Sequence, residues 1–189
     1  MCPTASCCGS CRTRGCEPLL DAERDADRIE AGVDRLSGGG ATAFCDALYS
    51  GLSLVAQDTG RCLLLLFSDG GDNASFLFRD DVVASVRRSM ATVYVVGTKT
   101  TGAGMSNPAL LQQVADIGGG NVLWAEDDSH LPALFAHVLD EFRARYLVTY
   151  TPTGVRRDDG WHKISVALKS KSGKVKTRPG YFAGPGKSR

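Results

Sequence analysis

Leu63-Leu64-Leu65-Leu66-Phe67-Ser68-Asp69-Gly70-Gly71-Asp72-Asn73 is the stretch that decides the fold of this chain. Its apolar half is a continuous run, which predicts a strand buried on both faces, as in the parallel sheets of α/β proteins. The run stops at a serine, an aspartate and two glycines. In an open α/β sheet, the groups just beyond the carboxyl end of a buried strand lie where ligands bind. Asp69 is therefore either a ligand for a hard cation or a residue that caps its own turn.

Helical and strand patterns alternate along the rest of the central region. Asn107 and Pro108 have the residue types that open a helix, and Gly38-Gly39-Gly40 has those that end one. The alternation predicts an α/β fold of βαβ units, with a parallel sheet between helix layers and right-handed crossovers. Apolar spacing predicts helices over residues 22–36, 42–55, 80–90, 108–117 and 131–142, and buried strands over residues 62–67, 92–96 and 121–124.

The C-terminal part of the chain has a different pattern. Three extended segments, over residues 146–151, 161–169 and 174–181, follow one another with no helix between them, which predicts an antiparallel extension. Its basic side chains are expected on solvent faces and strand edges, where lysine prevents edge pairing; binding of an anion or a nucleic acid is the alternative. These residues are Lys163, Lys169, Lys171, Lys174, Lys176 and Arg178.

Composition indicates one globular domain with an extension. The 189 residues carry a net charge of +1, no run is long enough to span a bilayer, and no signal peptide is visible. Five of the seven cysteines lie in the first 16 residues, where Cys8-Gly9-Ser10-Cys11 is a lone CxxC. A metal knuckle there would need further ligands, so a disordered leader is favoured. Cys45 and Cys62 fall on a helix and a strand and are expected to be buried.

Several segments, taken in order, resemble one family. They are the turn Gly38-Gly39-Gly40-Ala41-Thr42, the strand ending Phe67-Ser68-Asp69-Gly70, the run Arg145-Tyr146-Leu147-Val148-Thr149-Tyr150-Thr151-Pro152, and the end Arg178-Pro179-Gly180-Tyr181. Together they resemble a von Willebrand factor type A (VWA) domain, of the acidobacterial-type VWFA-related subgroup. The resemblance divides the chain into a leader (1–21), a partial Rossmann-like VWA domain with helices on both faces (22–144), a β extension (145–184) and a tail (185–189).

The resemblance implies a metal-ion-dependent adhesion site that holds Mg²⁺ or Mn²⁺ at the carboxyl side of the sheet. Thr42 matches the family's ligand threonine and Asp69 its third-loop aspartate, while Ser68 and Asp72 lie beside them as outer-sphere or loop residues. A simple helix N-cap is the alternative for Thr42. In the family, a carboxylate of a partner protein often completes the metal shell, so the expected function is protein–protein interaction of the adhesion type, without catalysis.

One element of the family pattern is missing. No Asp-x-Ser-x-Ser loop precedes Thr42, and the residues before 22 lack the family's leading strands, so we expect an N-terminally truncated fold. One carboxylate and one hydroxyl are too few for tight magnesium binding, so weak or absent affinity is expected. Without its mid-sheet neighbour, the strand at residues 62–67 becomes an edge, which favours self-association. Full-length relatives are mostly exported, although nothing in this chain shows export.

Two other function classes have weaker support in the sequence. The histidines, His130, His137 and His162, have no carboxylates at zinc-protease spacing, and no Gly-x-Ser-x-Gly elbow is present, so no enzyme is expected. The rival is a nucleotide or phosphate site in the loop at residues 97–104, which follows a buried strand and precedes a helix. Its candidate residues are Gly97, Lys99, Gly102 and Gly104, although the loop matches neither Gly-x-x-x-x-Gly-Lys-Ser/Thr nor Gly-x-Gly-x-x-Gly.

Overall fold

A three-stranded parallel sheet forms the centre of the fold. The computed structural model describes residues 5–8, 18–23, 27–28, 31, 34, 41–56, 60–98, 106–155, 160–169 and 172–183. Strand β4 (Thr92–Thr98) lies between β3 (Leu63–Ser68) and β5 (Val122–Ala125). Leu63 is level with Thr92, and Val95 is level with Val122. The predicted parallel sheet is therefore confirmed, with each strand within two residues of its expected bounds.

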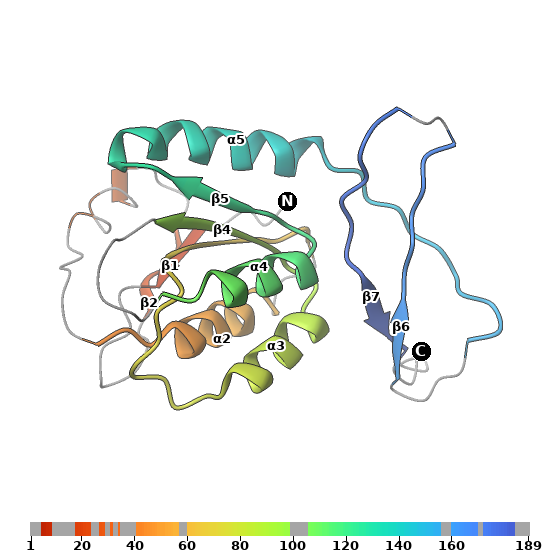
Figure 1. Cartoon of the computed structure of the whole chain (residues 1–189), viewed down its shortest axis with the longest axis horizontal. Helices are drawn as coiled ribbons and strands as arrows, with labels where there is room; N and C mark the ends of the chain where they lie inside the picture. The colour runs from red at the N-terminus through yellow and green to blue at the C-terminus, as the bar shows by residue number, and fades with distance from the viewer. Residues whose placement is uncertain are drawn as a thin grey trace.

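Helices cover both faces of this sheet, as predicted (Figure 1). On one face lie α2 (Phe44–Val55), α3 (Arg79–Arg88) and α4 (Pro108–Ile117). On the other lies α5 (Leu131–Ala144), which follows the short 3₁₀ turn η1 (Asp128–His130). Alternate strand residues point to the two layers because the side-chain period of a strand is two. The main core joins the strands to α2, α3 and α4 and includes Leu48, Val82, Val86, Val93, Val95, Leu111 and Val114, all fully buried.

Local sequence signals explain several helix ends. The Asn107 side chain accepts a hydrogen bond from the Leu110 N–H at 3.1 Å, and Pro108 occupies the first helical position of α4, as expected. At the end of α4, Gly119 has a φ of +75°, which suits a glycine after a helix. Cys45 and Cys62 are buried within the core, as predicted.

The N-terminal region differs from the prediction. Strand β1 (Ala5–Cys8) pairs antiparallel with β2 (Pro18–Glu23), and the two form a sheet of their own where an unstructured leader was expected. The helix expected over 22–36 is wrong at its start, because β2 continues to Glu23; positions 27, 28 and 31 are helical. Strand pairing across a turn does not require the local apolar period on which the prediction rested. Of the CxxC, Cys11 lies outside the described residues.

The C-terminal strands are shorter than predicted. β6 (Trp161–Lys163) and β7 (Gly180–Phe182) pair antiparallel, which confirms the antiparallel extension, but residues 164–169 and 174–179 lie outside the ladder. The strand expected over 146–151 is wrong: that segment belongs to no strand, and 94% of Tyr146 and 80% of Val148 are exposed. A segment with strand propensity becomes a strand only when another segment pairs with it. Here residues 146–151 have no such neighbour among the described strands.

Cationic contacts hold this C-terminal arm (residues 146–183) against the α/β body. Arg178 donates hydrogen bonds to the main-chain oxygens of Val86, at 3.0 Å, of Arg87, at 3.2 Å, and of Ser89. These carbonyls form the negative end of α3, where a guanidinium is favourable. Lys176 Nζ also lies 2.7 Å from Asp116 Oδ1, at the surface. Lys176 is exposed, as predicted, although it pairs with Asp116. The prediction of a solvent-facing side chain is wrong for Arg178, whose guanidinium binds the end of α3.

Aromatic rings complete the contact between the arm and α3. The guanidinium of Arg87 lies 5.7 Å from the ring centre of Trp161, and that of Arg88 lies 4.5 Å from the ring centre of Phe182. The remaining described lysines of the arm, Lys163, Lys169 and Lys174, are exposed as predicted, and Lys171 lies outside the described residues.

None of the helices that the structure describes is both long and apolar enough to cross a membrane.

Candidate functional site

Two segments far apart in the sequence meet at the carboxyl end of the sheet. One precedes α2 and contains Thr42; the other follows β3 and contains Asp69, Asp72 and Asn73. The Thr42 N–H donates to Asn73 Oδ1 at 2.7 Å, and the Thr42 carbonyl accepts from the N–H groups of Asn73, at 2.9 Å, and Ala74, at 3.1 Å. These three bonds fasten the exposed Thr42 to the loop that carries Asp69.

Ser68 and Asp69 shape the turn that leaves β3. Ser68 Oγ accepts from the Gly70 N–H at 3.0 Å, and Asp69 Oδ1 accepts from the Gly71 N–H at 2.9 Å. Gly70 has a φ of +82°, and a Cβ there would lie 2.6 Å from the Asn107 carbonyl oxygen, so both backbone conformation and space require glycine. The capping role weighed for Asp69 is present in the structure, and one of its two carboxylate oxygens remains for another contact.

Asp72 is the hydrogen-bonding centre of the site. Its Oδ2 accepts from the Cys45 N–H at 2.8 Å and from Ser75 Oγ at 2.7 Å, and its Oδ1 accepts from the Ser75 N–H at 3.1 Å. The residue at the N-cap position of α2, Ala43, has no side chain that could cap the helix. Asp72 therefore supplies from across the fold the acceptor that an N-cap residue normally provides.

Asp46, in the first turn of α2, also binds the loop that follows β3. Its Oδ2 accepts from the Phe76 N–H and its Oδ1 from the Leu77 N–H, each at 3.0 Å. The Asp46 N–H in turn donates to Ser75 Oγ at 3.2 Å. Asp46 and Ser75 are not among the site residues predicted from the sequence. The available signal was the carboxylate in the first turn of α2, where unpaired N–H groups attract an acceptor.

The charge states of this cluster follow from its contacts. Burial alone raises the pKa of Asp72, but the hydrogen bonds from Cys45 and Ser75 outweigh it and hold that pKa below its ordinary value. Burial, together with the hydrogen bond to Asp72 and its negative charge, raises the pKa of the Cys45 thiol to about 12. Cys45 is therefore a neutral, buried thiol, and the carboxylate beside it stays ionised.

Two aromatic side chains project from the loop that these carboxylates hold. Phe76 is 83% exposed and Phe78 is 79% exposed, although the backbone of residues 76 and 77 is fixed by Asp46. Large exposed apolar groups on a fixed backbone are typical of surfaces that bind another protein. We call the segment 69–78 with the start of α2 the loop platform.

Among its described residues, the loop platform offers few free oxygens to a divalent cation. In the parts of the chain that the structure describes, no group of three or more His, Cys, Asp or Glu side chains is placed to hold a metal ion. Asp72 and Asp46 use both of their oxygens on protein donors, and Asp69 uses one. Magnesium requires near-octahedral oxygen ligands and gives up its waters reluctantly. One Asp69 oxygen and the Thr42 hydroxyl do not meet this requirement.

The alternative prediction was a phosphate site in the loop at residues 97–104, and its described candidate residue, Gly97, gives that prediction no support. Gly97 lies in β4, and a Cβ at this position would lie 2.4 Å from the ring of Trp124, so a packing requirement accounts for the glycine. Lys99, Gly102 and Gly104 lie outside the described residues.

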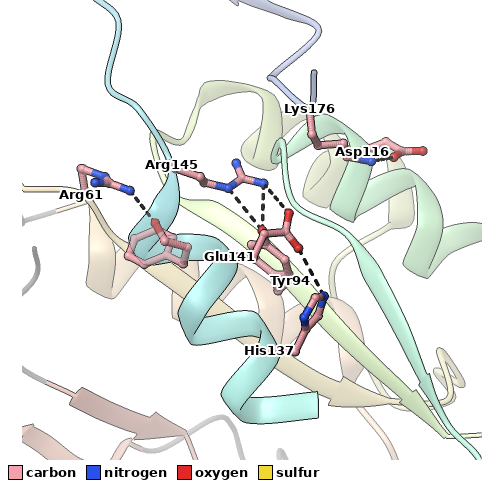
Figure 2. A network of polar contacts seen from close by, with 8 residues as sticks. Arg61, Tyr94, Asp116, His137, Glu141, Arg145 and Lys176 are labelled. Carbon is pink, nitrogen blue, oxygen red and sulfur yellow. Dashed lines mark hydrogen bonds and ion pairs between the residues drawn. The ribbon is translucent and has the colours of Figure 1, made fainter. Parts of the chain in front are cut away.

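A polar network joins β4 to α5 and the residue that follows it (Figure 2). The hydroxyl of the fully buried Tyr94 accepts from Arg145 Nη2 at 2.9 Å, and Arg145 also pairs with Glu141 at 3.5 Å. Burial and the hydrogen bond to Glu141 raise the pKa of Tyr94 to about 12 despite the nearby guanidinium. His137 lies 3.9 Å from Glu141 at the helix surface. His130 lies apart from this network, beside Asp127 at 3.0 Å.

Comparison with known proteins identifies the fold. No protein-family model and no curated protein matches the chain. Among solved structures, BatB from Bacteroides thetaiotaomicron, a conserved hypothetical protein, is 12% identical, with a TM-score of 0.53 over 69% of this chain and 76% of its own. An aerotolerance-related membrane protein from Bacteroides fragilis is 15% identical, with a TM-score of 0.53 over 69% of this chain and 75% of its own.

A von Willebrand factor type A protein from Catenulispora acidiphila also has this fold. It is 19% identical, with a TM-score of 0.57 over 74% of this chain, which spans 34% of that longer protein. At such identities the likeness concerns the fold alone. The chain therefore has a VWA-like α/β fold.

Proposed function

We propose that this chain is a non-catalytic protein-interaction domain of the VWA type, with a degenerate metal-ion-dependent adhesion site. The observation that carries the proposal is the loop platform. Asp72 and Asp46 fasten a ten-residue loop to α2 at the carboxyl end of the sheet, where α/β proteins bind their ligands. The likeness to the VWA protein of Catenulispora acidiphila supports the same reading.

The loop platform has the properties of a pre-organised docking surface. Its backbone is held by hydrogen bonds from both segments, so little conformational entropy remains to be lost when a partner binds. Phe76 and Phe78 provide exposed apolar area, and aromatic anchors of this kind contribute most of the energy of many interfaces. The partner would bury these rings.

Electrostatics separates two modes of binding at this surface. The carboxylates of Asp69 and Asp72 repel an acidic partner when no cation is present. An acidic partner would therefore require bound Mg²⁺ or Mn²⁺, whereas an apolar or basic partner would not. Because the protein donors are few, we propose that any cation binds weakly here.

Peptide display tests the proposal directly. The chain is immobilised and selected against a random twelve-residue peptide library in 5 mM MgCl₂, in MnCl₂ and in EDTA. Recovered sequences that bind the wild type but not the Phe76→Ser/Phe78→Ser double variant support the loop platform as the docking surface. A Tyr146→Ser variant, which removes an equally exposed ring from the arm, serves as the matched control.

Cation dependence of the selected peptides then identifies the mode. Acidic peptides recovered only with Mg²⁺ or Mn²⁺, and lost in Asp69→Asn, support cation-bridged capture. Peptides recovered equally in EDTA support metal-independent docking by the aromatic rings. Failure to select any peptide, or selected peptides that bind the Phe76→Ser/Phe78→Ser variant unchanged, would contradict the proposed function.

A further inference from the structure

In the part of the chain that the structure describes, the outer edge of β3 is apolar and belongs to no further ladder. β3 is the terminal strand of its sheet, and none of the other described strands hydrogen-bonds to its far side. The difference in burial is large: Val93, Val95 and Val96 in β4 are fully buried, whereas every leucine of β3 is only half-buried. Proteins normally protect such an edge with lysine, proline or a bulge. Leu63–Ser68 has none of these.

The ladder to β4 identifies which backbone groups face outward. The Thr92 N–H donates to the Cys62 carbonyl at 2.9 Å, and the parallel register continues without a shift from Leu63 to Ser68. In a parallel pair, alternate residues direct both backbone groups toward the neighbouring strand. The even-numbered residues of β3 therefore bond to β4. The N–H and C=O groups of Leu63, Leu65 and Phe67 point away from the sheet.

The same odd-numbered residues share the α5 side of the sheet. Phe67 stacks on Phe135 of α5 with ring centres 4.6 Å apart, yet 46% of Phe67 remains exposed. Two residues before the strand begins, Arg61 donates to the Phe142 carbonyl at 2.6 Å and lies 5.0 Å from the Phe142 ring centre (Figure 2). Along this side the edge therefore carries a cation, then three apolar residues, then an anion. In order, these are Arg61, Leu63, Leu65, Phe67 and Asp69.

The side chains along this edge complement the same side chains taken in the opposite direction, because the cation then lies opposite the anion. We propose that two copies of the chain pair antiparallel along β3, with Leu65 opposite Leu65 of the other copy. This register matches outward backbone groups with outward backbone groups about a two-fold axis, as does any register that sets odd-numbered residues opposite odd-numbered ones, and it centres the three apolar residues on that axis. It places Leu63 opposite Phe67 and Arg61 opposite Asp69, and each pair occurs twice. A register shifted by one residue would instead oppose outward and inward backbone groups.

The charges and the apolar area of this edge both favour a second copy of the chain as the binding partner. Opposite charges directly across an antiparallel pair are favourable, and a parallel arrangement would place like ends of β3 together. The pairing joins the two sheets into one continuous sheet, so the β3 edge of each copy is no longer exposed. It also brings Arg61 of one copy to Asp69 of the other, whose second oxygen accepts from no donor among the described residues. A guanidinium thereby occupies the position next to Asp69. The proposal does not depend on the proposed function.

Oligomeric state measured by analytical ultracentrifugation tests the pairing. The full chain should form a dimer whose fraction rises with concentration. Phe67→Lys places a charge opposite Leu63, and Leu65→Pro removes an outward N–H that β4 does not use. Each should weaken dimerisation at least tenfold. Val148→Lys, at an equally apolar and more exposed position in the arm, is the matched control and should leave the dimer unchanged.

Charge complementation separates loss of pairing from loss of folding. Arg61→Asp alone opposes two aspartates, and Asp69→Arg alone opposes two arginines, so each variant should be monomeric. Mixed together, the two variants form both ion pairs in the heterodimer, and dimer should return. This recovery requires that both variants are folded. Circular dichroism and thermal unfolding of each variant check the fold independently.

Three results would overturn the proposal. The wild type could remain monomeric up to several hundred micromolar. The dimer could resist Phe67→Lys and Leu65→Pro in variants that remain folded, or respond instead to Val148→Lys, which would assign the interface to the arm. Finally, mixing the folded Arg61→Asp and Asp69→Arg variants could fail to restore dimer.

Discussion

Replacement of Asp72 by alanine tests whether this side chain holds the loop platform together. The change removes acceptors for the Cys45 N–H at 2.8 Å, for Ser75 Oγ at 2.7 Å and for the Ser75 N–H at 3.1 Å. Loss of a helix cap costs about 1 kcal/mol, and loss of a hydrogen bond to a charged group costs about 1.5–3 kcal/mol. Asp72 is partly exposed, so water replaces some of these bonds. We expect Asp72→Ala to lower the free energy of unfolding by about 2 kcal/mol at pH 7.

The pH dependence of this loss is a second, independent readout. Because the folded state holds the pKa of Asp72 below its ordinary value, the carboxylate stabilises the fold fully above its unfolded pKa of about 3.9. That contribution disappears as the pH falls through the folded pKa. The stability difference between wild type and Asp72→Ala should therefore be complete at pH 7 and should narrow below about pH 4.

Urea unfolding of the two proteins, followed by circular dichroism at several pH values, measures this difference. Asp140→Ala is the control, because Asp140 lies on the exposed side of α5 and its contact among the described residues is an ion pair at 3.9 Å with Arg143. It should change stability by less than about 0.5 kcal/mol. The reasoning is refuted if Asp72→Ala costs no more than this control at pH 7. It is also refuted if the cost is as large at pH 3 as at pH 7.

Three further perturbations test other parts of the fold. Gly120→Ala should lower the free energy of unfolding by at least about 3 kcal/mol or prevent folding, because the new Cβ would lie 1.8 Å from the Val93 carbonyl oxygen. Thermal unfolding measures this loss, and a mild effect would contradict the packing. Arg178→Ala should release the arm from α3 and lower the free energy of unfolding by about 2 kcal/mol. Proteolytic cleavage within the arm should rise, and unchanged cleavage would contradict this role of Arg178. Ultraviolet titration should show Tyr94 ionising at about pH 12. Since its unfolded pKa is about 10, Tyr94 should lower the stability as the pH rises between these values, and Tyr94→Phe should make the fall shallower. The remaining fall includes the contribution of the Cys45 thiol, whose pKa is also raised to about 12.

The α/β core was predictable because its signals are local. The apolar run at 63–67, the periodic faces of α2 to α5, and the Asn107-Pro108 helix start each lie within one element, and the structure forms each of them. The arm shows the limit of such signals. Residues 146–151 have strand propensity, but propensity alone cannot provide the neighbouring strand that a ladder requires, and the structure leaves them unpaired.

The candidate site was predictable only in part, for a related reason. Thr42 and Asp69 could be named from the resemblance to the VWA family, and Ser68 and Asp72 because they lie beside Asp69 at the end of a strand. The bonds of Asp72 to Cys45 and of Asp46 to Phe76 join residues about thirty positions apart, and no local pattern reports them. Arg178 likewise has the composition of a surface residue, yet it caps a helix roughly ninety residues earlier in the chain.

Periodicity and residue type by themselves determined that this chain builds a parallel sheet between helix layers, with polar loops following the strands. Only the tertiary structure decided which carboxylates accept hydrogen bonds from main-chain donors and which basic residues fasten the arm to the body. The physical reason is that burial and hydrogen-bond satisfaction depend on what surrounds a group in space, whereas sequence reports only what lies next to it along the chain.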